Sequence, residues 1–234
     1  MNDGVETERS TRGHSTWFLV IVALFIASLI ASNIVAVKLI EFSGLILTAA
    51  IVIFPISYII GDVLTEVYGY RRARRAIWLG FLSNLVVVLV IVIAGVLPAA
   101  DFWKDQAAFD LILGQTPRIL VASFVAYLVG EFTNSYILAK LKVATEGRHL
   151  WLRTIGSTLI GQGLDSVIFV VIAFAGVLPS EILIATMVTQ WLVKSGYGVV
   201  ATPLTYLAVG FLKARDGVDV YDRDTRFNPL LIVD

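Results

Sequence analysis

Residues 154–178 read TIGSTLIGQGLDSVIFVVIAFAGVL, an almost continuous apolar stretch with a carboxylate, an amide and several small residues near its middle. A helix needs about 20 apolar residues to cross the hydrocarbon core of a bilayer, and this stretch has that length. Gln162 and Asp165 then lie at the depth of the hydrocarbon, where polar groups face protein or water rather than lipid. The stretch therefore predicts a membrane-spanning helix that faces a polar interior.

The composition of the whole chain agrees with a membrane protein. Of its 234 residues 58% are hydrophobic and 15% charged, whereas about 25% are charged in soluble domains. The charges cluster between apolar runs, which excludes a water-soluble enzyme. Lys plus Arg equals Asp plus Glu at 18 each, so no net basic field attracts nucleic acid. The absence of cysteine excludes disulfides, thiolate zinc sites and iron–sulfur clusters.

The same length criterion finds six spans in the chain. They cover residues 17–37, 44–67, 76–97, 119–139, 154–178 and 182–212. The predicted fold is an all-α membrane protein with six transmembrane helices at 17–212, an N-terminal segment at 1–16 and a tail at 213–234. Because proline removes a helical hydrogen bond, Pro55 predicts a kink in the second span, and Pro203 suggests that the overlong last span bends or unwinds.

Basic residues set the predicted orientation. Most of them occur in the N-terminal segment, in the second-to-third and fourth-to-fifth connections and in the tail. The positive-inside rule places these segments, and so both termini, in the cytoplasm. Residues 99–116 predict a short helix at the outer interface, either a plain connection or a lid. The polar tail after residue 216 is expected to be loosely ordered.

Two pairs of similar motifs predict an internal repeat. YIIGD at 58–62 returns as YLVGE at 127–131, and AGVLP occurs at both 94–98 and 175–179. The two helix pairs, second with third and fourth with fifth, run in the same direction, as in parallel transporter repeats. The acidic residues should then occupy related positions around one central cavity.

Polar side chains inside the spans indicate a site, since a charge at the bilayer centre costs about 2.5–3.5 kcal/mol and is presumed to have a use. In the last span Gln190 and Lys194 are four residues apart and share a helix face. Lys194 is the only basic residue deep in a span, so its predicted partner is Asp165 or Glu131. The alternative is an ion pair that only fixes the register of the helices.

Other polar residues allow a structural as well as a functional interpretation. Asp62 and Glu66 share a helix face. They are either partners of the arginines at 71–75 or groups that bind and release a proton, if transport is driven at all. Amides of the other spans could simply join helices by hydrogen bonds: Asn33, Asn84 and Asn134.

Intramembrane enzymes are a competing class. His14 and His149 both lie in hydrophilic segments, so no span offers a Ser–His pair or a histidine zinc motif. An aspartyl enzyme with two membrane carboxylates stays open on counting alone. A structural or assembly subunit would leave the buried amides and carboxylates unexplained. We therefore expect a transporter with no catalytic residue, no metal and no cofactor.

Several motifs are similar to those of one known family. The matching residues are SNI at 32–34 with Lys38, FPIS at 54–57, GDVLTEVYGY at 61–70, GST at 156–158 with Gln162, Asp165 and Ser166, and Lys194 before Pro203. They resemble the queuosine precursor transporter family, within the vitamin-uptake-like transporters. The resemblance implies a six-helix importer in the bacterial inner (plasma) membrane. Its cargo would be 7-cyano-7-deazaguanine or the aminomethyl relative, for queuosine modification of tRNA.

A deazaguanine presents adjacent N–H donors and an acceptor carbonyl, so its site should offer a carboxylate, amides and an ammonium. The predicted substrate-binding residues are Asp165, Gln162, Glu131, Asn134, Lys194, Gln190, Asn33, Asn84 and Trp191. Phe169 and Tyr127 are further stacking candidates. Expected partners are this small molecule and the bilayer, with no direct nucleic acid. The sequence leaves open the exact deazapurine, the coupling ion and a homodimer. The alternative function is the substrate-binding subunit of an energy-coupling vitamin importer.

Overall fold

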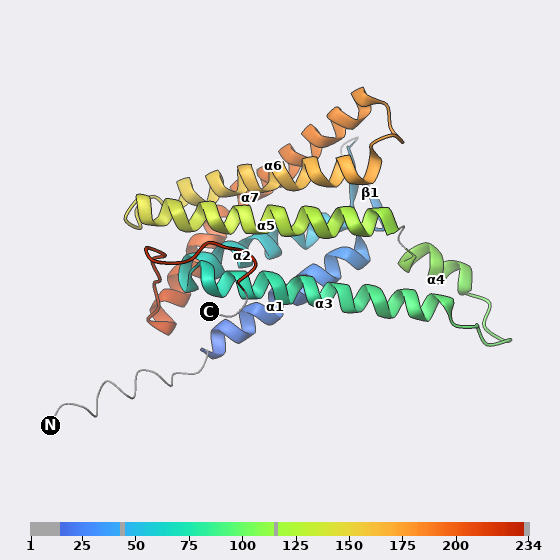
Figure 1. The fold of residues 1–234 in the computed structure, drawn as a ribbon, viewed down its shortest axis with the longest axis horizontal. Helices are drawn as coiled ribbons and strands as arrows, with labels where there is room; N and C mark the ends of the chain where they lie inside the picture. Colours follow the sequence, from blue (N-terminus) through green and yellow to red (C-terminus); the bar gives the residue numbers. More distant parts are fainter. Residues whose placement is uncertain (1–14, 43–44, 115–116, 232–234) are drawn as a thin grey trace.

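The computed structural model describes residues 15–231 apart from 43–44 and 115–116. Most of the described chain is helical (Figure 1). The elements are α1 (Thr16–Val35), β1 (Leu39–Phe42), β2 (Leu45–Thr48), the short 3₁₀ helix η2 (Ala49–Val52), α2 (Phe54–Tyr68), α3 (Tyr70–Val96), α4 (Gln106–Leu113), α5 (Pro117–Ala144), α6 (Leu150–Phe174) and α7 (Ser180–Asp216). The strands β1 and β2 form an antiparallel hairpin.

Five segments of the described chain are long and apolar enough to cross a membrane. They are α1, α3, α6, α7 and the stretch Gln106–Ala144 that contains α5. The predicted class, a helical multi-pass membrane protein, is confirmed. Figure 1 shows α5 and α6 running antiparallel beside each other. Helix α2 contacts α1, α3, α5 and α7, so it lies at the centre of the bundle.

The second predicted span, 44–67, is not one continuous helix. Strand β2 and η2 occupy its first part, and α2 begins only at Phe54, with Pro55 in its first turn. The predicted kink at Pro55 is therefore wrong. Proline lacks an N–H and is favoured in the first turn, where that donor has no helical partner, so it starts this helix instead of bending it. The 15 residues of α2 span only about 22 Å at 1.5 Å per residue.

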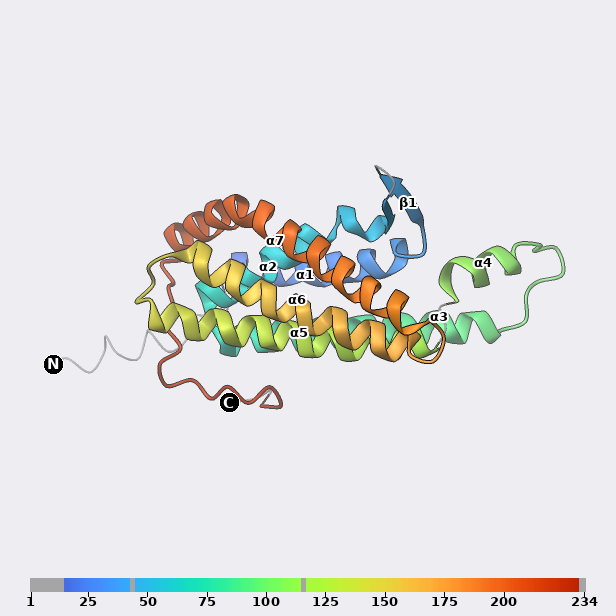
Figure 2. The ribbon, with the colours of Figure 1, turned by 90° about the horizontal axis from the view of Figure 1, so that it is seen from above.

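The last predicted span bends but does not unwind. Helix α7 runs without interruption from Ser180 to Asp216 with Pro203 inside it. Figure 2 shows its axis curving along its length. The short helix predicted in residues 99–116 is present as α4, which projects beside the end of α3 (Figure 2).

Glycines bring the backbones of α5 and α6 together. A Cβ atom on Gly161 would lie 2.9 Å from the Cβ atom of Asn134 and 3.0 Å from the carbonyl oxygen of Gly130. A Cβ atom on Gly130 would lie 2.8 Å from the Cβ atom of Asp165. Any side chain at either glycine would push the helices apart. The close approach sets the polar residues of both helices against each other.

The C-terminal tail packs against the bundle, so the expectation of a loosely ordered tail is wrong. Asp222 accepts a hydrogen bond from the backbone N–H of Tyr70 at 2.9 Å, at the first residue of α3. Arg74 donates to the carbonyl oxygen of Asn228 at 2.8 Å. The Phe227 ring packs against Tyr70, with ring centroids 4.9 Å apart. Side chains of α3 thus satisfy tail carbonyl groups that an isolated segment would leave to water.

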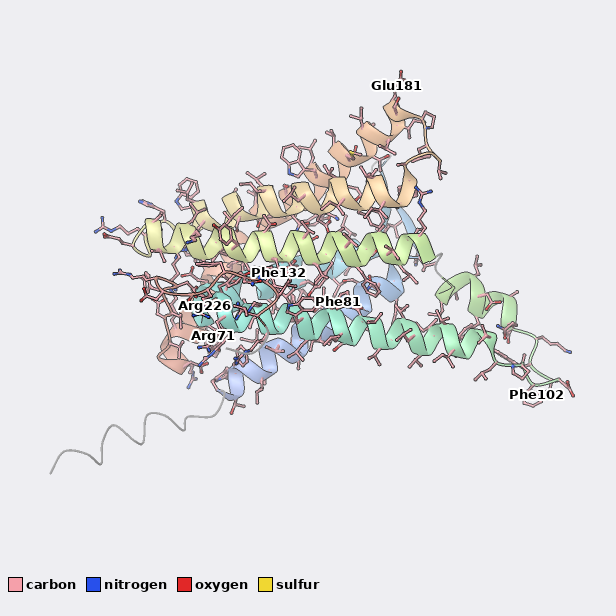
Figure 3. All side chains as sticks on the ribbon, viewed as in Figure 1. Arg71, Phe81, Phe102, Phe132, Glu181 and Arg226 are labelled. Atoms are coloured by element: carbon pink, nitrogen blue, oxygen red, sulfur yellow. The ribbon has the colours of Figure 1, made fainter. Side chains whose placement is uncertain are left out.

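The two ends of the bundle differ in charge. Figure 3 shows Arg71 and Arg226 at the end where α1 begins and the tail packs, and Phe102 and Glu181 at the other end. This grouping matches the predicted segregation of basic residues. It puts the start of α1 and the tail on one side, and the positive-inside rule predicts that this side is cytoplasmic.

Candidate functional site

A cavity of about 730 Å³ lies among α1, α2, α3, α5, α6 and α7. Sites for small molecules are typically about 300–1,000 Å³. Most of the predicted substrate-binding residues line this cavity: Asn33, Asn84, Glu131, Gln162, Asp165, Gln190 and Lys194. The structure thus brings together residues that are far apart in the sequence. Asn134 and Trp191 do not line it.

The cavity contains an ion pair between α6 and α7. The Lys194 ammonium contacts Oδ2 of Asp165, with 19% and 17% of the two side chains exposed. Of the two partners predicted for Lys194, the structure selects Asp165. In the described part of the chain, Oδ1 of Asp165 has no hydrogen-bond donor from the protein. An acceptor oxygen therefore remains for a ligand.

Glu131 enters the cavity from the neighbouring helix α5. Its side chain is buried, at 7% exposure. Its Oε2 atom lies 3.2 Å from the position that a Cβ atom on Gly61 would take, so the carboxylate stands against the backbone of α2. Within the described ranges, no hydrogen bond or salt bridge reaches this carboxylate.

Asp62 and Asn134 form a pair outside the cavity. The Asn134 side-chain amide donates to Oδ1 of Asp62 at 2.8 Å, and both residues are buried. This bond ties α5 to α2, as the structural interpretation of Asn134 proposes. Because Asn134 lies about one turn beyond Glu131, the bond also puts Asp62 and Glu131 at a similar depth, as the repeat predicts.

Glu66 is the centre of a buried ion cluster between the cavity and the tail. Arg153 binds both of its carboxylate oxygens, at 2.7 and 2.8 Å, and Lys213 contacts Oε1 at 2.8 Å. Lys142 lies 3.6 Å from the same carboxylate and 2.5 Å from Asp219. Within the described ranges, the partners of Glu66 therefore come from α5, α6 and α7, and the predicted pairing with the arginines at 71–75 is wrong for this residue.

Asn33 and Asn84 are bonded to each other. The Asn33 amide donates to Oδ1 of Asn84 at 2.8 Å and so joins α1 to α3. Both residues also line a second cavity, of about 270 Å³, between these helices and α4. The pair therefore joins two helices, as one interpretation predicted, and it also lines the central cavity.

The aromatic lining of the cavity matches the prediction only in part. Tyr127 and Phe169 line the cavity, whereas Trp191 is 37% exposed and donates from Nε1 to the carbonyl oxygen of Leu159 at 2.9 Å. Sequence reasoning missed four further aromatic residues of the lining: Tyr58, Phe81, Phe124 and Tyr197. A signal existed for two of them. Tyr58 is one turn before Asp62, and Tyr197 is one turn after Lys194.

Two buried polar atoms of the lining have no partner in the described part of the chain. They are the Oγ atom of Ser57 and the Oε1 atom of Gln162. Buried polar groups are nearly always hydrogen-bonded in native proteins, by protein, water or a ligand. Oε1 of Gln162 is an acceptor only, so it fits an N–H donor. Among the described residues, no three His, Asp or Glu side chains gather as a metal site.

A central cavity with charged and aromatic side chains, among helices of which most are long enough to cross a membrane, fits a small-molecule transporter. A family model described as "Putative vitamin uptake transporter" matches residues 48–208. The chain is 31% identical to a "Probable queuosine precursor transporter" of Bacillus subtilis (strain 168) over 76% of this chain and 79% of that protein. The chain therefore belongs to the family of putative vitamin uptake transporters that the model describes. It is also 29% identical to a "Queuosine precursor transporter" of Escherichia coli (strain K12), over 52% of each chain. No solved structure matches the chain.

Proposed function

We propose that the protein imports a queuosine precursor, 7-cyano-7-deazaguanine or a close relative, across the bacterial inner membrane for tRNA modification. The names of the relatives support the class of cargo. The observation that carries the proposal is Asp165, a carboxylate held by Lys194 in a membrane-embedded cavity with one acceptor oxygen left over.

The chemistry of the lining suits a guanine edge. The ring N–H and the exocyclic amine of a deazaguanine are adjacent donors, which a carboxylate accepts as a pair. Gln162 offers a further acceptor, and Tyr127 and Phe169 offer faces for stacking the base. Lys194 balances the charge of Asp165 when the cavity is empty.

If transport is coupled to protons, Asp62 is the better of the two candidates named from the sequence. Glu66 is bound by Arg153 and Lys213, which stabilise its charged form. Asp62 has only the neutral amide of Asn134 as its hydrogen-bond partner in the described part of the chain. We assign a coupling role to Asp62 and a structural role to Glu66.

The decisive experiment is uptake of a radiolabelled deazaguanine by the purified protein alone in liposomes. Accumulation above empty liposomes, reduced by unlabelled deazaguanine but not by adenine, supports the proposal. A substrate-binding subunit of an energy-coupling importer would bind the base but would not move it without separate ATPase chains. Binding without uptake would therefore favour that alternative.

A further inference from the structure

The charges that line the central cavity do not balance. Among its described lining residues there are three carboxylates, Glu131, Asp165 and Glu181, and a single basic side chain, Lys194. Lys194 is already engaged by Asp165. Glu181 lies in the exposed first turn of α7, where water screens it. Glu131 is therefore the carboxyl group inside the cavity that has no basic partner among the described residues.

The described residues around Glu131 offer no group that would neutralise a negative charge on its side chain. The acids Asp62 and Asp165 are close enough to repel it electrostatically. None of the hydrogen bonds and salt bridges of the described residues supplies it with a donor. A buried, charged carboxylate without a partner is unfavourable by several kcal/mol. Glu131 therefore needs either a bound proton or a cation that the cargo supplies.

Glu131 and Asp165 are positioned to contact two different groups of one cargo molecule. The preceding residue, Gly130, packs against the Cβ atom of Asp165, so the two carboxylates enter the cavity from adjacent positions on α5 and α6. Only Asp165 has an ammonium to balance it. Lys194 balances the charge of Asp165, which therefore suits neutral N–H donors. Glu131 has no basic partner among the described lining residues and therefore suits a cation.

We propose that Glu131 makes the cavity selective for a guanine-like base that carries a positively charged arm. This inference rests on the proposed function and narrows its cargo. The aminomethyl form has an ammonium on its arm at neutral pH, whereas the nitrile of the cyano form is neutral and only accepts hydrogen bonds. The ammonium supplies the charge that Glu131 lacks. The nitrile would bring its own partial negative charge to the carboxylate.

Competition in proteoliposomes tests the selectivity. Uptake of a radiolabelled aminomethyl deazaguanine is measured against unlabelled aminomethyl, cyano and N-acetylated aminomethyl forms. We expect the aminomethyl form to compete at a concentration at least about tenfold lower than the cyano form, a difference of about 1.4 kcal/mol. The acetylated form keeps the N–H but loses the charge, so it should compete no better than the cyano form.

The variant Glu131→Gln keeps the size of the side chain and removes its charge. We expect the preference for the aminomethyl form to fall to within about twofold, because the neutral amide no longer attracts the ammonium. Asp224→Asn is the matched control, because Asp224 is an exposed carboxylate of the tail and its loss should leave the preference intact. The analogue series on the wild-type protein tests the idea without any variant, so a folding defect in Glu131→Gln does not decide the matter.

The possible outcomes distinguish a failure of this selectivity from a failure of the proposed function. Equal competition by the aminomethyl and cyano forms in the wild-type protein overturns the inference while the proposed function stands. A preference that survives in Glu131→Gln overturns it as well. A change in the pH dependence of uptake of both forms, without a change in their ratio, shows that Glu131 binds a proton instead of the arm. Uptake of neither base removes the proposed function and this inference with it.

Discussion

Asp165 provides the first test at the level of a single residue, because its carboxylate is the one that Lys194 holds in the cavity. Asp165→Asn keeps the size of the side chain but replaces one acceptor oxygen with a donor that opposes the donors of the base. We expect uptake to fall by at least about 100-fold, since sites built on buried hydrogen bonds discriminate by up to about 10⁴-fold. Initial rates in proteoliposomes measure the loss.

Folding of the Asp165→Asn variant is the control for this result. Lys194 is 19% exposed to the cavity, so its ammonium can reach water there when its partner is neutral. The variant should therefore elute as a single peak in size-exclusion chromatography, like the wild-type protein. Normal uptake by the variant, or equal competition by adenine-like and guanine-like analogues, would show that Asp165 is structural and that recognition occurs elsewhere.

Glu66 lies in the buried ion cluster and not in the cavity lining, so its removal should lower the stability of the folded protein. Glu66→Gln would leave Arg153, which is 1% exposed, without its carboxylate partner and would weaken the contact with Lys213. Breaking a buried ion pair on one side costs about 3–5 kcal/mol, or roughly 6–20 °C in melting temperature at about 2–4 °C per kcal/mol. Thermal unfolding in detergent measures the shift.

A matched variant separates the buried network from a general effect of charge. Glu146 lies in the exposed connection between α5 and α6. Glu146→Gln should change the melting temperature by no more than a degree or two, because surface charges contribute about 0–1 kcal/mol. If Glu66→Gln is as stable as Glu146→Gln, the cluster contributes nothing to the fold, and Glu66 becomes a candidate for transport chemistry again.

At the level of elements, the ion cluster ties the C-terminal tail to the bundle and makes that attachment sensitive to acid. Burial opposes ionisation of Asp219, but its contacts with Lys142 and Lys213 outweigh burial and hold the pKa of this carboxyl below its ordinary value of 3.8. A lowered pKa in the folded state means that ionised Asp219 contributes stability above the unfolded-state pKa and loses it as the pH falls through the folded-state pKa.

The difference in melting temperature between the wild-type protein and Asp219→Asn should therefore be constant from neutral pH down to about pH 4 and shrink below it. Trp78 reports the same event, because its indole N–H donates to the carbonyl oxygen of Pro229 at 2.8 Å in the docked tail. Its fluorescence should change as the tail detaches. A difference in stability that is the same at every pH would mean that Asp219 does not act through its charge.

Elements that depend on hydropathy alone were predictable from the sequence, and those that depend on distant contacts were not. Long apolar runs indicated α1, α3, α6 and α7 because the bilayer imposes their length. The start of α2 was not evident, since an apolar run before Pro55 suits a strand, a turn or a helix equally. The docked tail was missed because its order comes from partners such as Tyr70 and Arg74, about 150 positions away in the chain.

The residues of the candidate site also divide into those that the sequence predicts and those that depend on helix packing. Lys194 and Asp165 were predictable as partners because charges in a membrane need each other. Asn134 and Trp191 have the right chemistry, but the rotation of each helix turns them toward Asp62 and toward the backbone of α6. Composition and spacing give the depth of a residue in the membrane. Helix packing, which the glycines at 130 and 161 control, decides which side of the helix faces the cavity.

For the whole molecule, the segregation of charge predicts one orientation in the membrane. The basic connections, the start of α1 and the tail lie at one end of the bundle, and Phe102 and Glu181 lie at the other (Figure 3). Reversal would put the basic end outside, against the positive-inside rule.

The chain has no native cysteine, so Lys104→Cys and Arg148→Cys each introduce a single label site at an exposed position. In intact cells a membrane-impermeant thiol reagent should label position 104 at once and position 148 only after permeabilisation. The cysteine-free wild-type protein gives the background. The opposite pattern would place the tail outside and Glu181, at the other end of the bundle, on the cytoplasmic side.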